Sequence, residues 1–167
     1  MDEEILEAID AEDTEKKEEV SEEEAVNYLV FKAGLNFYAI ESKNIQEVLR
    51  NNEIFPVPFV PDYMKGVVNF YGKPCAVVDF SLFQDYAELN SKLFLVLKDE
   101  NDIAFQVSEI LDFHNSKNGT IQKIAGASEA SSFNSTLSFM GNNGPVNAPI
   151  LNLNGIISKI RMDLENA

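Results

Sequence analysis

Apolar and polar residues follow one another in short runs from residue 27 onward. Runs of about four to eight residues, rich in Val, Ile, Leu, Phe and Tyr and bounded by turn-forming residues, are typical of β-strands. Turn-forming residues fill 33–35, 99–102 and 115–119, and the Asn118-Gly119 pair favours the positive φ of a hairpin turn. The pattern predicts strands at 27–33, 36–41, 44–50, 66–71, 74–80, 92–98, 103–108, 109–113 and 148–153.

Two stretches have a helical pattern instead. Ser81 is placed to cap a short helical turn over residues 81–88, and Asn154 precedes a C-terminal helix. In each stretch apolar side chains recur at helical spacing, and those of the first stretch are expected to face inward. These side chains are Leu82, Phe83 and Tyr86 in the first stretch, and Ile156, Ile157, Ile160 and Leu164 in the second.

Residues 125–148 follow neither pattern. They are rich in Ala, Ser, Asn and Gly, and we expect a long loop with a broken edge strand there. Elsewhere, short strands at regular spacing with little helix favour a closed or sandwiched β architecture. The 167 residues suit one domain, and a chain of this size can bury a core without a metal or a disulfide.

The acidic residues of the chain are concentrated near its N-terminus. The formal net charge is −15, and residues 1–24 hold 13 acidic residues and 2 lysines, which leaves −4 for the remainder. We therefore predict an acidic N-terminal arm at 1–26 and one domain at 27–167. The arm is either a solvated tail or a segment that docks on the domain or on a partner, since Ile5, Leu6 and Ile9 would share one helical face.

Charge and hydropathy also exclude several classes of partner. Only two arginines, Arg50 and Arg161, are present, and phosphate backbones need clustered cations, so nucleic acid is not an expected partner. The chain has no run of 18 apolar residues and begins Met-Asp-Glu-Glu. We therefore expect neither a secretory signal nor direct membrane insertion, and we expect a cytoplasmic protein.

The residues that usually carry catalysis are scarce. Cys75, the only cysteine, lies within an apolar run and is expected to be a small buried hydrophobe, whereas His114, the only histidine, is expected in a loop or at an edge. The acidic residues of 99–102 lack the spacing of a calcium loop, and 141–144 lacks the Lys-Ser/Thr of a phosphate loop. We expect no enzyme, no cofactor and no metal site.

The most specific motif lies between residues 45 and 80. An apolar run ends near Glu47, prolines at 56, 58 and 61 force an extended crossing, and a second apolar run starts at Gly66. This order of residues resembles the CheW-like domain, the coupling adaptor of bacterial chemotaxis. The matching residues are Glu47, Val48, Leu49, Arg50, Ile54, Pro56, Pro58, Pro61, Gly66, Val67, Asn69, Phe70, Gly72, Val77, Val78 and Asp79, with Tyr28–Phe31 and Gly34–Ile40 fitting the first hairpin.

The resemblance implies a fold and a set of partners. The fold is mostly β, with two SH3-like five-stranded β-barrels side by side, short helices and a C-terminal helix. The function is a non-catalytic scaffold or adaptor that couples chemoreceptor cytoplasmic tips to the regulatory domain of the chemotaxis histidine kinase. Other CheW-like domains are further possible partners, and the protein would join membrane receptor arrays only through such partners.

The resemblance also assigns two sets of contact residues. Receptor helices would lie in a groove between the barrels, and the kinase would contact the barrel end that carries the proline loop. The groove candidates are Ile45, Glu47, Val48, Leu49, Val67, Phe70 and Tyr71, and the kinase-contact candidates are Phe55, Pro56, Pro58, Phe59 and Pro61. The alternative for the apolar groove residues is simple core packing. The aromatic and methionine side chains of the loop either form a contact patch or cap the open end of the barrel. These side chains are Phe55, Phe59, Tyr63 and Met64.

The chain departs from the family pattern at charged positions. Tyr71 stands where the family has an arginine that pairs with the glutamate matching Glu47, and a tyrosine hydroxyl replaces one hydrogen bond without the charge. Other departures are Ala76 for Pro, Ser108 for Asp and Asn152 for Asp. Two alternatives therefore stay open: a divergent adaptor of another chemosensory or motility pathway, or a competitor in the array. A small-molecule-binding β-barrel protein is a third, more remote alternative.

Overall fold

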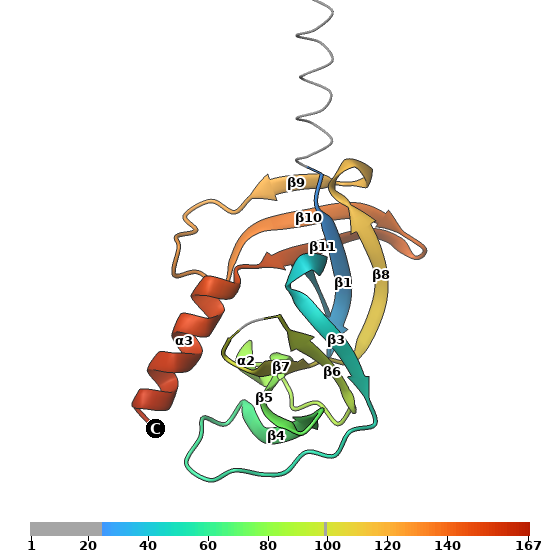
Figure 1. Ribbon diagram of the computed structural model, residues 1–167. Helices are drawn as coiled ribbons and strands as arrows, with labels where there is room; N and C mark the ends of the chain where they lie inside the picture. Colours follow the sequence, from blue (N-terminus) through green and yellow to red (C-terminus); the bar gives the residue numbers. More distant parts are fainter. Residues whose placement is uncertain (1–24, 99) are drawn as a thin grey trace, which may run out of the picture.

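The computed structural model describes residues 25–98 and 100–167. Most of the predicted acidic arm lies outside these residues. Val26 already belongs to the folded part: its N–H donates to Ser116 Oγ, and its carbonyl accepts from the Ser116 N–H. Two β-sheets make up the domain, one above the other in Figure 1, and a long C-terminal helix runs beside both.

The first sheet has six strands in the order β8-β1-β2-β11-β10-β9. Neighbours run antiparallel except β11 and β2, which pair in parallel at Ile150 and Ala39. The strands are β1 (Asn27–Ala33), β2 (Asn36–Glu41), β8 (Glu109–Asn115), β9 (Thr120–Lys123), β10 (Phe133–Gly141) and β11 (Gly144–Leu151).

The second sheet has five strands in the order β3-β6-β7-β5-β4. Only β5 and β7 are parallel. Its strands are β3 (Ile45–Arg50), β4 (Met64–Phe70), β5 (Lys73–Asp79), β6 (Leu93–Leu97) and β7 (Ile103–Gln106). The 3-10 helix Ser42–Asn44 carries the chain from β2 of the first sheet directly into β3 of the second.

Three hydrophobic clusters explain why so many strands read as continuous apolar runs. Along β1, Tyr28 and Val30 point into a cluster that belongs to the first sheet, whereas Leu29 and Phe31 point into a large cluster between the sheets. Successive side chains of a strand face opposite sides, so a strand buried on both faces is apolar throughout. The third cluster fills the second sheet's own interior, around Phe94.

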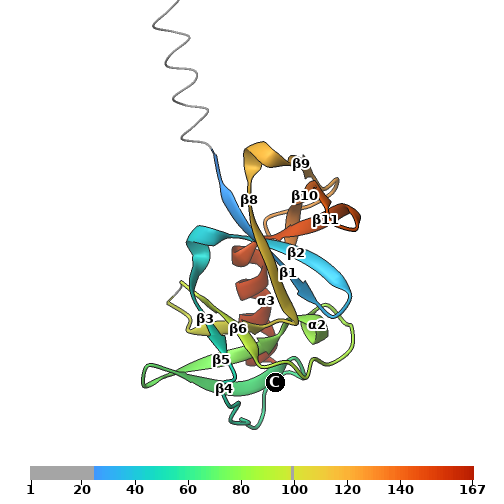
Figure 2. The same ribbon diagram turned by 90° about the vertical axis from the view of Figure 1, so that its right-hand side faces the viewer.

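Helices α2 and α3 close the space between the sheets. Helix α2 (Phe80–Phe83) follows β5 directly, and helix α3 (Leu153–Glu165) lies against both sheets in Figures 1 and 2. Ile156 and Ile160 of α3 are fully buried in the central cluster. Helix α3 therefore joins the two subdomains through apolar contacts at helical spacing. Two details of the prediction are wrong: the helix begins at Leu153, so Asn154 lies inside it, and Leu164 of the predicted stripe is exposed.

The predicted fold class is confirmed: the protein is mostly β, with two subdomains, short helices and a C-terminal helix. The first sheet has six strands where five were predicted, because Thr120–Lys123 adds a strand that pairs with β10. The predicted loop at 125–148 is wrong, since most of it forms the β10–β11 hairpin. Polar side chains such as Ser138 and Asn147 lie on that hairpin's outer face, while Leu137 and Ala148 are buried.

Two local predictions are also wrong. Ser81 does not cap the helical turn: Asp79 does, and the helix covers only Phe80–Phe83, which leaves Tyr86 exposed. Gly119 is extended, with φ of −149°, because a 3-10 turn at Ser116–Asn118 replaces the predicted hairpin turn.

Tyr38 makes the stability sensitive to alkaline pH. Its side chain is buried, and burial raises its pKa to about 12. The pKa of an unfolded tyrosine is about 10, so the unfolded chain loses this proton first. The stability present below pH 10 is therefore lost as the pH rises toward 12. We expect Tyr38→Phe to reduce this loss, measured as urea midpoints at pH 9 and pH 11.5. Equal pH dependence in the two proteins would contradict the assignment.

Candidate protein-docking site

The proline-containing loop between β3 and β4 is the most exposed apolar segment of the motif region. Phe59 is 90% exposed and Phe55 is 52% exposed, although both are large apolar side chains. Phe59 also has a positive φ of 59°, which is unusual for an aromatic residue. Aromatic side chains are enriched at protein interfaces, and strained backbone conformations are enriched at functional sites.

A backbone bridge fixes this loop to the second sheet. The Phe55 N–H donates to the Val67 carbonyl at 2.8 Å, and the Val67 N–H donates to the Phe55 carbonyl at 2.9 Å. The bridge places the loop beside β4, so the exposed Phe55 ring sits on a rigid support. Contact residues on rigid elements lose less conformational entropy on binding.

Gly66 allows the loop to approach β4 this closely. A Cβ at this position would lie 2.1 Å from the Phe55 carbonyl oxygen, and the Gly66 φ is 137°. Glycine alone tolerates both the contact and the backbone conformation. The glycine of the motif is therefore explained by the bridge.

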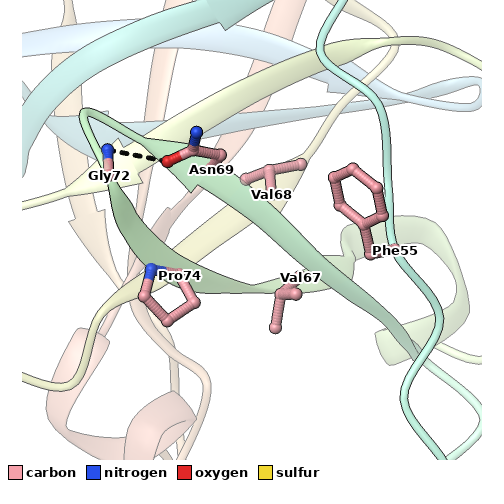
Figure 3. Close-up of a pocket in the computed structure, with 6 residues that line it drawn as sticks. All are labelled: Phe55, Val67, Val68, Asn69, Gly72 and Pro74. Carbon is pink, nitrogen blue, oxygen red and sulfur yellow. Dashed lines mark hydrogen bonds between the residues drawn. The ribbon is translucent and has the colours of Figure 1, made fainter.

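A shallow hollow of about 270 Å³ lies under the loop. In Figure 3, the Phe55 ring comes from the loop, and the other lining side chains come from the β4–β5 hairpin. The Asn69 side chain accepts a hydrogen bond from the Gly72 N–H at 2.7 Å and so holds the hairpin turn. The lining residues are Phe55, Val67, Val68, Asn69, Gly72 and Pro74.

Exposure divides the four aromatic and methionine side chains of the loop into two pairs. Phe55 and Phe59 are exposed and do not cap a barrel. Tyr63 is buried against Phe83, and Met64 packs against the same central cluster. Of the four side chains, only the two phenylalanines are therefore accessible candidates for contact with a partner. The remaining kinase-contact candidates lie on the same loop and are exposed or half-buried: Pro56, Pro58 and Pro61.

The groove candidates lie on different faces of the second subdomain. Ile45 and Val48 are half-buried against the central cluster between the sheets, whereas Leu49 and Phe70 pack against the interior cluster of the second sheet. Val67 faces the hollow under the proline loop instead. Their shared strands, β3 and β4, form the two edges of this sheet.

Glu47 and Tyr71 bring those two edges together. The Tyr71 hydroxyl donates to Glu47 Oε1 at 2.9 Å, which is the single hydrogen bond that a tyrosine at this position was expected to provide. This bond and the carboxylate charge raise the pKa of Tyr71, whose side chain is otherwise 82% exposed. The pair lies at the surface where β3 meets the β4–β5 turn.

A second hollow, of about 330 Å³, lies next to this pair. Phe70 lines it, and the Phe70 and Tyr71 rings pack edge to face with centroids 4.9 Å apart. Lys73 and Asp102, at its rim, form an ion pair of 2.8 Å. Cys75 also lines it and is buried, and burial raises the pKa of the Cys75 thiol, which opposes reactivity.

The described residues offer no centre for metal binding. They contain no group of three or more His, Cys, Asp or Glu side chains that could hold a metal ion. His114 lies on β8, the edge strand of the first sheet, and its ring stacks on Phe139 at 3.9 Å. Among the helices of the described part of the chain, none is long and apolar enough to span a membrane.

The supporting roles of two side chains were missed by the sequence interpretation. Buried Asp79 accepts hydrogen bonds from the backbone N–H groups of Ser81, Leu82 and Leu89. An aspartate at the end of an apolar strand, just before a helical segment, was the available signal. Tyr63 donates to Asp163 of α3 at 2.8 Å, a contact across 100 residues that no local pattern indicates.

Comparisons with known proteins agree with this geometry. Residues 27–161 match the CheW-like domain family. Among solved structures, the scaffolding protein TtCheW from Thermoanaerobacter tengcongensis aligns with a TM-score of 0.62 and 14% sequence identity, over 77% of this chain and 91% of that one, which confirms the fold of two SH3-like subdomains. No curated protein matched. Because the family match covers most of the sequence, this chain belongs to the CheW-like domain family.

Proposed function

We propose that this protein is a non-catalytic chemotaxis adaptor that couples chemoreceptor tips to the regulatory domain of a chemotaxis histidine kinase. The observation that carries the proposal is the pair of exposed phenylalanines on a loop fixed to β4 by two backbone hydrogen bonds. Family membership supplies the class of partner. Under this proposal the protein works in the cytoplasm, at receptor arrays, as a domain of residues 27–167 that follows an acidic arm.

The kinase-contact surface of the proposal is the proline loop. Phe55 and Phe59 offer the aromatic anchors that dominate many protein interfaces. Ile45 and Val48, half-buried between the subdomains, belong to the receptor side together with the Glu47–Tyr71 pair. The neutral Tyr71 at a charged family position favours the second candidate, a divergent adaptor of another chemosensory or motility pathway or a competitor in the array.

The packed interiors of both subdomains do not favour a small-molecule binding protein. Each interior is filled by its own apolar cluster. Ligand sites are usually concave, with a few convergent polar groups. The hollow under the proline loop is shallow and opens on the surface instead.

Reconstitution with partners from the same genome tests the proposal. The full chain, the kinase regulatory domain and receptor-tip fragments would be mixed in pairs and together, and complexes followed by sedimentation velocity. A ternary complex that requires this chain is the expected result. A chain that binds neither partner would overturn the proposal, and one that binds the kinase while excluding receptors would identify a competitor.

We expect Phe59→Ala to weaken binding to the kinase regulatory domain by about 30-fold, as the loss of an interface hot spot does. Because the ring is 90% exposed, the free energy of unfolding should stay within about 0.5 kcal/mol of the wild type. Titration calorimetry measures the affinity. Leu35→Ala, at an 89% exposed hairpin tip, is the matched control and should bind normally. Equal affinities for the two variants would remove Phe59 from the interface.

A further inference from the structure

We propose that a hollow beside β2 binds an uncharged, proline-rich segment of a partner protein in the polyproline II conformation. The hollow has a volume of about 390 Å³ and lies between β2, β11 and the segment that follows α2. It shares no lining residue with the kinase-contact or groove candidates, so the proposal goes beyond the adaptor function. The lining residues are Leu35, Asn36, Phe37, Tyr38, Gln84, Tyr86, Phe133, Asn147 and Pro149.

The pairing of β2 with β11 explains why a hollow opens at this place. Among the described residues, the ladder between these strands is a single parallel pair. When the register of that pair is continued toward the start of both strands, Tyr38 lies beside Pro149 and Asn36 lies beside Asn147. Pro149 has no N–H to donate to a longer ladder. Both strands are internal to the six-stranded sheet, so a ligand meets side chains there and no free strand edge.

Aromatic rings supply much of the apolar surface of the hollow. The Tyr38 and Phe133 rings stack with centroids 5.6 Å apart. Burial raises the pKa of Tyr38, and the nearby Tyr86 phenol raises it further, so the two tyrosine side chains lie close together. Tyr38 is buried, whereas Tyr86 is 56% exposed. Proline-rich segments bind to aromatic-lined grooves of this kind.

The polar side chains of the hollow offer hydrogen-bond donors. Within the part of the chain that the structure describes, the Tyr86 hydroxyl and the Gln84 amide make no hydrogen bond to another residue. Asn147 Oδ1 accepts from the Ser138 hydroxyl at 2.7 Å, which leaves the Asn147 NH₂ group for a ligand. A polyproline II backbone has no internal hydrogen bonds, and proline has no N–H. Such a ligand therefore brings carbonyl acceptors to a surface that offers donors.

The charges around the hollow favour a neutral ligand. None of the lining residues is charged. Lys32 borders the hollow, because its ammonium group lies over the Phe37 ring at 5.1 Å from the centroid. Asp85 follows Gln84 directly and carries the opposite charge. A charged ligand would lose its water here without a counter-ion in the lining, whereas a neutral proline segment has no such cost.

The prolines of this chain do not provide the ligand. All six lie between residues 56 and 149, so the acidic arm contains none. Residues 58–61 have the Pro-x-x-Pro spacing, but Phe59 within them has a φ of 59°, whereas polyproline II needs about −75°. The hydrogen bonds between Phe55 and Val67 also hold this loop against β4. The ligand therefore comes from a different protein.

Titration of a decaproline peptide into the isotope-labelled full chain, followed by NMR, tests the proposal. The side-chain amide signals of Asn36, Gln84 and Asn147 are expected to shift. Tyr86→Ala removes a ring and a donor and should weaken binding about tenfold. Tyr86→Phe removes only the donor and should weaken it about threefold. Phe113→Ala is the matched control, since it removes a 63% exposed ring on β8 and should leave the affinity unchanged.

Other occupants give different results in the same experiment. A Gly-Ser peptide of equal length should shift none of these signals, and shifts equal to those of decaproline would overturn the proposal. It is also overturned if decaproline shifts no signal, or if Tyr86→Ala binds it as tightly as wild type. Shifts of the same signals on concentrating the chain without peptide would identify a second copy as the occupant and would likewise overturn it. Tyr86→Ala should retain binding to the kinase and the receptor tips, so failure of the adaptor function is detected separately.

Discussion

Gly66→Ala is expected to lower the free energy of unfolding by about 3–5 kcal/mol, the range of a close backbone clash combined with an unfavourable φ. The new Cβ would lie 2.1 Å from the Phe55 carbonyl oxygen, and the backbone at Gly66 has a φ of 137°. Relief requires the loop to move away from β4. That movement breaks both hydrogen bonds between Phe55 and Val67. Urea unfolding monitored by circular dichroism measures the loss.

Gly72→Ala provides the matched control in the same hairpin. Gly72 also has a positive φ, of 84°, but its added Cβ would meet no atom within 4 Å. This substitution carries only the backbone strain and should cost about 1 kcal/mol. If both variants lost the same free energy of unfolding, the contact with Phe55 would not contribute to the cost of a side chain at position 66. If the bridge positions Phe59 for the kinase, Gly66→Ala should also weaken kinase binding.

Much of the strand pattern was predictable because a strand that is buried on both faces is apolar at consecutive positions. β1 is apolar at successive positions because its side chains fill two different clusters. β6, Leu93–Leu97, is buried at every position for the same reason. A strand of this kind is recognisable without knowledge of its neighbours.

The β10–β11 hairpin was not predictable in the same way. Its outer face carries polar residues, and its inner face uses small or widely spaced side chains such as Ala148. Pro145 and Pro149 also lie within β11, and proline argues against a strand in sequence interpretation. Pairing with β2 and β9 supplies the tertiary context that stabilises the hairpin.

The motif of the candidate docking loop was recognisable in the sequence, but the exposure of its individual side chains was not. Phe59 and Tyr63 are both aromatic loop residues, yet one is exposed and the other is buried. Tyr63 is held by Phe83 and by Asp163 of α3, and these contacts exist only in the folded chain. The groove candidates do not share one face of the sheet, and the reason is local. Val67 and Phe70 are three residues apart on β4, so their side chains face opposite sides.

Asp79→Asn is the second large effect that we expect, a loss of about 3 kcal/mol. Asp79 is fully buried, and its two oxygens accept from the backbone N–H groups of Ser81, Leu82 and Leu89. An asparagine retains one acceptor oxygen, so its NH₂ group must face at least one backbone donor. Loss of a charge-assisted bond and one unsatisfied buried donor together account for the magnitude.

Asp112→Asn is the control for Asp79→Asn, because Asp112 Oδ1 also accepts a backbone N–H, from Phe113, but at an exposed site. Water replaces the lost interaction there, so the change should stay within about 0.5 kcal/mol. Urea unfolding at pH 7 compares the two variants. The Asp79 N–H also donates to the Tyr63 carbonyl, at the end of the proline loop. Asp79→Asn leaves this backbone bond in place, so the expected loss is one of stability. A variant with wild-type stability would show that the buried charge does not support α2.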